Sequence, residues 1–194
     1  MRTRTSTNVL VILFLFFHTA IALADSPDWP AIVRAWDEYC EIPDQESAAL
    51  LLEALPRRAL QIEERPDLQT VDRLYWGLAC LAPRLLEGDE QAVLIGFRLL
   101  FFTDAAYGED LAALLGDVSS RHPVLFLRVL QDERPKHPTS HDPISVVTMF
   151  GSDLTLDQVR TERTNRIAAI ASVERADLRE TRDEVLKLLE DYEL

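Results

Sequence analysis

The sequence predicts an all-α protein of about eight helices, arranged as stacked antiparallel helix pairs or as an irregular helical bundle. Hydrophobic residues make up 47% of the 194 residues, which is enough to build a substantial core. They recur at helical spacing along most of the chain. No long segment alternates apolar and polar residues as a half-buried strand does, so strands are not expected to dominate.

The N-terminal segment 1–24 is typical of a secretory signal. Arg2 and Arg4 precede an unbroken apolar run at 9–17, and small residues follow it. As a helix, 9–24 reaches roughly 24 Å, short of the ~30 Å hydrocarbon core of a bilayer. A cleaved signal is therefore favoured over a retained anchor. We expect a periplasmic or secreted protein, from a bacterium, without stable membrane insertion after cleavage.

The helices of the first third are bounded by proline. The apolar residues of 29–39 fall on one helical face, and 47–55 is rich in alanine and leucine. Pro56 interrupts this second helix, because proline lacks the N–H that a helix interior needs. We expect 57–64 to continue the helix after a kink.

A third helix is expected over 68–80, with Pro83 ending it. Gly88 and Asp89 then open a fourth helix, in which the run 93–102 is apolar nearly all round. A helix that is apolar on all sides is buried on most of them. This helix is therefore expected at the centre of the fold.

Two shorter helices are expected next. Gly108 and Gly116 are expected to bound a helix at 109–115. Ser120 is expected to cap the following helix, with Pro123 in its first turn.

The segment 131–143 contains three prolines and hardly any apolar side chain, which predicts a loop. It separates a helical core at 25–130 from C-terminal residues 144–194, which we expect to pack on that core. Within them, 144–150 is the one place where a strand is allowed. Two further helices are expected, one capped by Thr155 and running to 173, and one at 177–192.

Helix starts near residues 47, 68, 89, 109 and 122 are separated by about 20 residues, or about 40 for each helix pair. With the stretch DLQTVDRLYWGLACLAPRLLEGDEQAVLIGFRLL, this spacing resembles HEAT and armadillo repeats over 47–131. The resemblance implies a curved stack of antiparallel helix pairs with a concave binding face. An irregular bundle predicts almost the same spacing, so both arrangements stay open.

The charge of the chain excludes some partners. The formal net charge is −13, and loss of Arg2 and Arg4 with the signal makes it more negative. Such a charge repels nucleic-acid phosphates and anionic lipid surfaces, whereas it attracts a basic protein or peptide. No phosphate loop or dinucleotide fingerprint occurs among the six glycines, and no cofactor is predicted.

Cys40 and Cys80 are the two cysteines of the chain. An isolated pair in an oxidising compartment usually forms a disulfide. With this separation between the two cysteines, the bridge would stabilise the fold by about 4 kcal/mol at most. The alternative is two buried thiols. Their separation differs from the spacing of a catalytic Cys-x-x-Cys pair.

His137 and His141 are the candidate metal ligands, because two imidazoles at this spacing can share one Zn²⁺ on a helix. Pro138 lies between them and disfavours a regular helix, so a solvated loop is the alternative. The neighbouring Ser140, His141 and Asp142 do not form a hydrolase triad, whose members converge from different parts of a fold.

Arg160, Arg163 and Arg166 are three residues apart along one expected helix. They are candidates for a carboxylate- or anion-binding site. The alternative is that they join the helix to acidic neighbours or face solvent.

Trp76 is the candidate contact residue for a partner. It lies off the apolar face that carries Leu74 and Leu78, so we expect partial exposure. The aromatic residues Trp29, Trp36 and Tyr75 are expected mainly in the core, since large aromatics at helical spacing usually pack there.

These observations favour an exported acidic helical protein that binds a protein or peptide partner, and no catalytic motif is recognisable. One alternative is an inhibitor or immunity-type protein that neutralises a basic enzyme of the cell envelope. A second alternative is an enzyme that uses the loop of His137 and His141.

Overall fold

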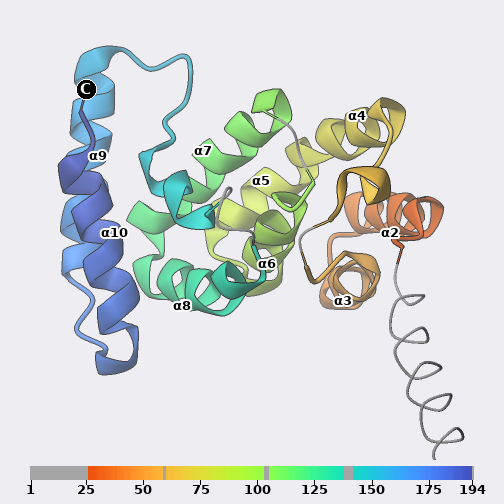
Figure 1. The fold of residues 1–194 in the computed structure, drawn as a ribbon, viewed down its shortest axis with the longest axis horizontal. Coiled ribbons are helices and arrows are strands. Elements are labelled where there is room, and N and C mark those ends of the chain that lie inside the picture. Colours follow the sequence, from red (N-terminus) through yellow and green to blue (C-terminus); the bar gives the residue numbers. More distant parts are fainter. Residues whose placement is uncertain (1–25, 59, 103–104, 138–141, 194) are drawn as a thin grey trace, which may run out of the picture.

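The computed structural model describes residues 26–58, 60–102, 105–137 and 142–193; the predicted signal lies outside them. The described residues form helices with short 3₁₀ turns and contain no strand, which confirms the all-α class (Figure 1). The helices are α2 (Trp29–Glu41), α3 (Gln45–Ala54), α4 (Leu68–Trp76), α5 (Leu78–Glu87), α6 (Glu90–Leu99), α7 (Ala105–Arg121), α8 (Pro123–Glu133), α9 (Leu156–Ala171) and α10 (Arg179–Asp191). In these ranges no helix combines the length and hydropathy that crossing a bilayer requires.

Helices α6 and α7 lie at the centre of the molecule. Helix α6 packs on α3, α5, α7 and α8, and α7 packs on α5, α8 and α9. The pair α9 and α10 forms one end of the molecule, and α2, α3 and α4 form the other (Figure 1). The largest buried apolar side chains come from both halves, and include Trp36, Phe97, Leu111 and Phe126.

Helix α6 is buried as its apolar sequence predicts, and it takes one charge into the interior. Arg98 is buried and donates to the Leu52 carbonyl oxygen at 2.6 Å, while its Nε lies 3.9 Å from Glu133 Oε2 of α8. Burial lowers the pKa of Arg98, whereas the charge of the nearby Glu133 acts to raise it. The ion pair thus joins α6 to α8.

The helix breaks of the first half differ from those expected. The segment 57–64 does not continue α3, and its described residues contain only the short 3₁₀ helix Ile62–Glu64. Pro83 lies inside α5, and the break falls at Gly77 instead. A Cβ on Gly77 would lie 2.0 Å from Nε1 of Trp36, so close packing of this indole requires glycine.

Helix α7 runs without interruption through Gly108 and Gly116, so the predicted short helix at 109–115 was wrong. Gly116 is needed for packing, because a Cβ there would lie 2.4 Å from Nη1 of Arg166. Ser120 lies within α7, and His122 precedes α8 in its place, with Pro123 at the first position as predicted.

The apolar segment at 144–150 is not a strand. Residues Pro143–Thr148 form a 3₁₀ helix that buries Ile144, Val146 and Val147 and packs on α7 and α10. The expected cap of α9 is confirmed: Thr155 Oγ1 accepts from the Gln158 N–H, and Gln158 Oε1 accepts from the Thr155 N–H.

Candidate functional site

Arg166 lies at the junction of α9 with the rest of the molecule and is fully buried. Its Nη1 donates to the carbonyl oxygens of Val147 at 2.9 Å and Met149 at 2.8 Å. Its guanidinium carbon lies 4.4 Å from the centre of the Phe150 ring. The arginine therefore holds the end of the 3₁₀ helix Pro143–Thr148 and the residues that follow it against α9.

Two carboxylates complete the surroundings of Arg166. Its Nη2 donates to Asp117 Oδ1 of α7 at 2.8 Å, and its Nε donates to Glu162 Oε1 of α9 at 3.3 Å. Because all these hydrogen bonds go to groups of the protein itself, the guanidinium of Arg166 joins its helix to acidic neighbours. This is the alternative that the sequence left open for the three arginines.

The other two arginines of α9 have separate surroundings. Arg163 donates to the carbonyl oxygens of Leu189 at 2.6 Å and Glu190 at 2.8 Å, near the C-terminus of α10. Arg160 is exposed and pairs with Asp157 at 3.1 Å. The structure therefore does not bring the three guanidinium groups together around one site.

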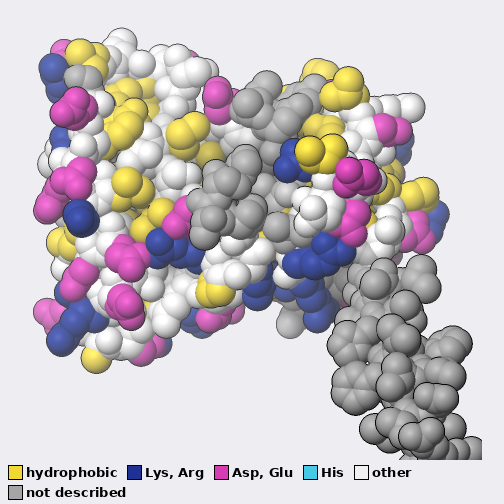
Figure 2. Space-filling view, viewed as in Figure 1, with side chains coloured by type: hydrophobic (Ala, Val, Ile, Leu, Met, Phe, Trp, Pro, Cys, Tyr) yellow, Lys and Arg dark blue, Asp and Glu magenta, His cyan; other side chains and the backbone are white. Residues whose placement is uncertain are grey.

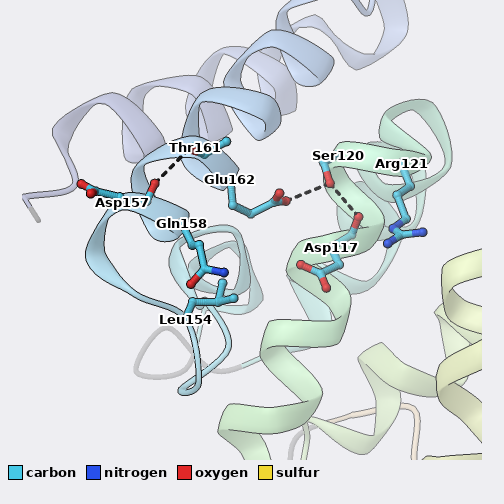
Figure 3. A pocket seen from close by; sticks show the side chains of 8 residues that line it. All are labelled: Asp117, Ser120, Arg121, Leu154, Asp157, Gln158, Thr161 and Glu162. Carbon is cyan, nitrogen blue, oxygen red and sulfur yellow. Dashed lines mark hydrogen bonds between the residues drawn. The ribbon is translucent and has the colours of Figure 1, made fainter.

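A polar cleft of about 430 Å³ lies between α7 and α9. Figure 3 shows Glu162 of α9 pointing across it toward Ser120 of α7, whose Oγ donates to Glu162 Oε1 at 3.0 Å. The lining residues are Asp117, Ser120, Arg121, Leu154, Asp157, Gln158, Thr161 and Glu162. Sequence reasoning did not find this cleft, because its two walls are far apart in the chain and carry no motif.

Asp117 faces this cleft with 42% of its side chain exposed. Burial of the remainder raises the pKa of Asp117 above the ordinary value, and the Arg166 guanidinium acts in the opposite direction. The Asp117 carboxylate thus lies at the edge of the cleft, where Arg166 holds it through Oδ1.

The most exposed large apolar side chains lie at the opposite end of the molecule. Ile62 is 78% exposed, Leu68 70% and Trp76 79%. We call these three residues the α4 surface. Hydrophobic side chains gather over α4 in Figure 2, with charged ones beside them. The exposure of Trp76 exceeds the partial exposure expected from the sequence.

The side of α4 opposite to Trp76 is anchored. Val71 and Leu74 are buried beneath the helix. The Tyr75 ring meets the Trp76 ring edge-on at 6.3 Å, and the Tyr75 hydroxyl donates to Asp110 of α7 at 2.6 Å. This hydrogen bond and the negative charge of Asp110 raise the pKa of Tyr75. Trp76 is therefore presented from a fixed backbone.

Acidic side chains interleave in sequence with the residues of the α4 surface. Glu63, Asp67 and Asp72 are all exposed. Asp67 caps α4 by accepting from the Thr70 N–H at 2.8 Å, and this hydrogen bond lowers the pKa of Asp67. The surface thus combines apolar contact area with acidic side chains.

The remaining expected aromatic residues are packed as the sequence indicates. Trp36 is buried, and Trp29 packs edge-on against Phe102 with ring centres 4.9 Å apart. Trp29 also donates through Nε1 to the Glu64 carbonyl oxygen at 3.0 Å.

The predicted disulfide is confirmed. Cys40 near the end of α2 is bonded to Cys80 in the first turn of α5, with the Cα atoms 5.4 Å apart. The bridge ties α2 to α5 close to Gly77.

The two histidines proposed for metal binding do not form a described site. His137 stacks on Phe101 with ring centres 4.0 Å apart, whereas His141 lies outside the described residues. Within the described ranges, no three histidine, cysteine or carboxylate side chains are grouped so as to hold a metal.

Comparison with known proteins adds no relative: no protein-family model, curated protein or solved structure matches this chain.

Proposed function

We propose that the protein is an exported, acidic, helical binding protein that holds a basic protein or peptide partner on its α4 surface. The observation that carries the proposal is Trp76, which is 79% exposed on a helix whose other side is buried. Tryptophan is the side chain most enriched among residues that dominate binding energy at protein interfaces. Two further apolar side chains, Ile62 and Leu68, extend the contact area.

The chemistry of the partner follows from charge. Exposed Glu63, Asp67 and Asp72 interleave in sequence with the apolar residues, and the whole chain carries a net charge of −13. A partner segment with lysine or arginine beside apolar side chains complements such a surface. The long-range field of the acidic chain also attracts a basic protein before contact.

The location belongs to the same proposal. The N-terminal segment has the layout of a secretory signal, and a disulfide such as Cys40–Cys80 persists in oxidising compartments. We therefore propose action in the bacterial periplasm or outside the cell.

Affinity capture tests this function. The full chain is expressed for export, recovered from the periplasm and immobilised, and cell-envelope extract is passed over it. We expect the wild-type protein to retain a basic protein, and Trp76→Ala to lose it. Leu156→Ala is the matched control, because Leu156 is 51% exposed but lies in α9 at the other end of the molecule.

Capture that is equal on wild-type protein and Trp76→Ala would refute the role of the α4 surface. The activity of a captured enzyme, measured with and without this protein, separates simple binding from the inhibitor or immunity-type alternative. An inhibitor lowers that activity at stoichiometric amounts, and its association rate falls with added salt.

A further inference from the structure

Helix α4 is held by the two helices that the disulfide joins. Among the described helices, α4 packs chiefly on α2 and α5. Cys40 belongs to α2 and Cys80 to α5, four residues after Trp76. Any separation of α2 from α5 would therefore disturb the packing of α4 on both helices.

The contacts around Gly77 concentrate this support at the end of α4. Cys40 Sγ lies 3.6 Å from the carbonyl oxygen of Gly77. The Trp36 indole occupies the space beside Gly77 where a side chain would otherwise lie. The disulfide, the indole and the helix break thus form one packed unit around Gly77, the residue that follows Trp76.

The other polar links of α4 are weak. Arg73 pairs with Asp37 of α2 at 2.7 Å, but both side chains are largely exposed, at 61% and 43%. Exposed ion pairs contribute little to stability. Tyr75 adds one hydrogen bond to Asp110. A helix of 9 residues is also too short to be stable by itself.

We propose that the Cys40–Cys80 disulfide is a redox control of the α4 surface, which is ordered only while α2 and α5 are bridged. In the reduced protein α4 opens locally, and Trp76 is no longer presented from a fixed backbone. This inference rests on the proposed function for its biological meaning, since binding would become available only after export and oxidation.

The chemistry is thiol–disulfide exchange with an external thiol as the reductant. Its thiolate attacks one sulfur of the bridge, which breaks the S–S bond and releases the other cysteine as a thiolate that takes up a proton. A second thiol then resolves the mixed disulfide. Two cysteine thiols form, and the two reductant molecules leave as one disulfide. Cys40 and Cys80 are both partly exposed, so a small thiol can reach the bridge.

Hydrogen–deuterium exchange on the full exported chain tests the control without any partner. The oxidised protein is compared with protein reduced by dithiothreitol, and with a Cys40→Ser/Cys80→Ser variant in the absence of reductant. We expect amides of α4 to exchange about tenfold faster or more in both reduced and variant protein. Amides of α9 and α10, at the far end of the molecule, should keep their exchange rates.

Two results would overturn the inference. Unchanged exchange in α4 would show that the other contacts hold this helix without the bridge. Equal acceleration in α4, α9 and α10 would show that the disulfide stabilises the whole fold and controls no local surface. Neither result depends on a partner, whereas failure of the capture experiment with oxidised protein would refute the proposed function alone.

Discussion

Arg166 and Asp117 form a 2.8 Å ion pair that joins α9 to α7 across 49 residues of sequence. The arginine is fully buried, whereas the aspartate reaches the polar cleft. A buried guanidinium is stable only when its donors are satisfied. Here two carbonyl oxygens and two carboxylates accept hydrogen bonds from the guanidinium. Arg166 thereby attaches the helix pair α9 and α10 to the rest of the molecule.

Replacement of Arg166 tests that attachment. Arg166→Met removes the hydrogen bonds and leaves the Val147 and Met149 carbonyl oxygens without this donor. We expect a loss of about 3 kcal/mol in the free energy of unfolding, measured by urea denaturation. Arg166→Lys should lose nearly as much, because one ammonium cannot replace the planar fork of a guanidinium.

Arg160→Met is the matched control, since Arg160 is an exposed arginine on the same helix. It should change stability by less than about 1 kcal/mol. Equal losses in Arg160→Met and Arg166→Met would contradict the structural role assigned to Arg166.

The contact between Gly77 and Trp36 gives a second prediction. In Gly77→Ala the new Cβ would overlap the indole, whose Nε1 would lie 2.0 Å away. The backbone of Gly77 has φ of −79°, which alanine also adopts, so the penalty comes from packing alone. We expect a loss of about 1–3 kcal/mol in the free energy of unfolding.

A double-mutant cycle identifies the cause. Trp36→Phe removes the overlapping part of the ring, so Gly77→Ala should cost less in the Trp36→Phe background than in the wild type. Equal costs in the two backgrounds would show that the indole is not what excludes a side chain at position 77.

The raised pKa of Tyr39 leads to a prediction about the free energy of unfolding at alkaline pH. Burial, together with the nearby Asp89 charge, raises the pKa of Tyr39 from 10.0 to about 12. A raised pKa in the folded state means that the phenol stabilises the fold below pH 10, and that this contribution is lost as pH rises toward 12. The loss amounts to about 2 kcal/mol.

The measurement is urea unfolding of wild-type protein and Tyr39→Phe at several pH values. The wild type should lose stability relative to Tyr39→Phe between pH 10 and 12, and the gap between the two proteins should be constant below pH 10. A constant gap over the whole range would show that the Tyr39 phenol titrates normally.

Much of the helical content could be predicted from local pattern. The apolar run of α6 and the Thr155 cap of α9 depend on neighbours within one or two turns, and both were confirmed. The disulfide also followed from the cysteine content and the expected compartment. The resemblance to HEAT and armadillo repeats stays a prediction.

The errors arose where a distant contact decides the structure. Glycine is locally unfavourable in a helix, so local pattern predicts a helix end at Gly116, but the Arg166 guanidinium needs the space there. Pro83 is accommodated within α5, while packing of Trp36 places the break at Gly77. The burial of Arg166 depends on Asp117 of another helix, and spacing within α9 cannot reveal it.

Trp76→Ala should separate binding from folding. The indole is mostly in solvent, so its removal should change the free energy of unfolding by less than about 0.5 kcal/mol. Affinity for the captured partner should fall by about 30-fold or more. Circular dichroism, urea unfolding and titration calorimetry measure both quantities, and a destabilised but fully binding variant would contradict the assignment.

The most direct test of the central claim is a hydrogen–deuterium exchange footprint of the complex between the oxidised protein and its captured partner. We predict that amides of Leu68–Trp76 exchange more slowly in the complex, while those lining the cleft between α7 and α9 do not change. Slower exchange at the cleft with no change in α4 would contradict the account.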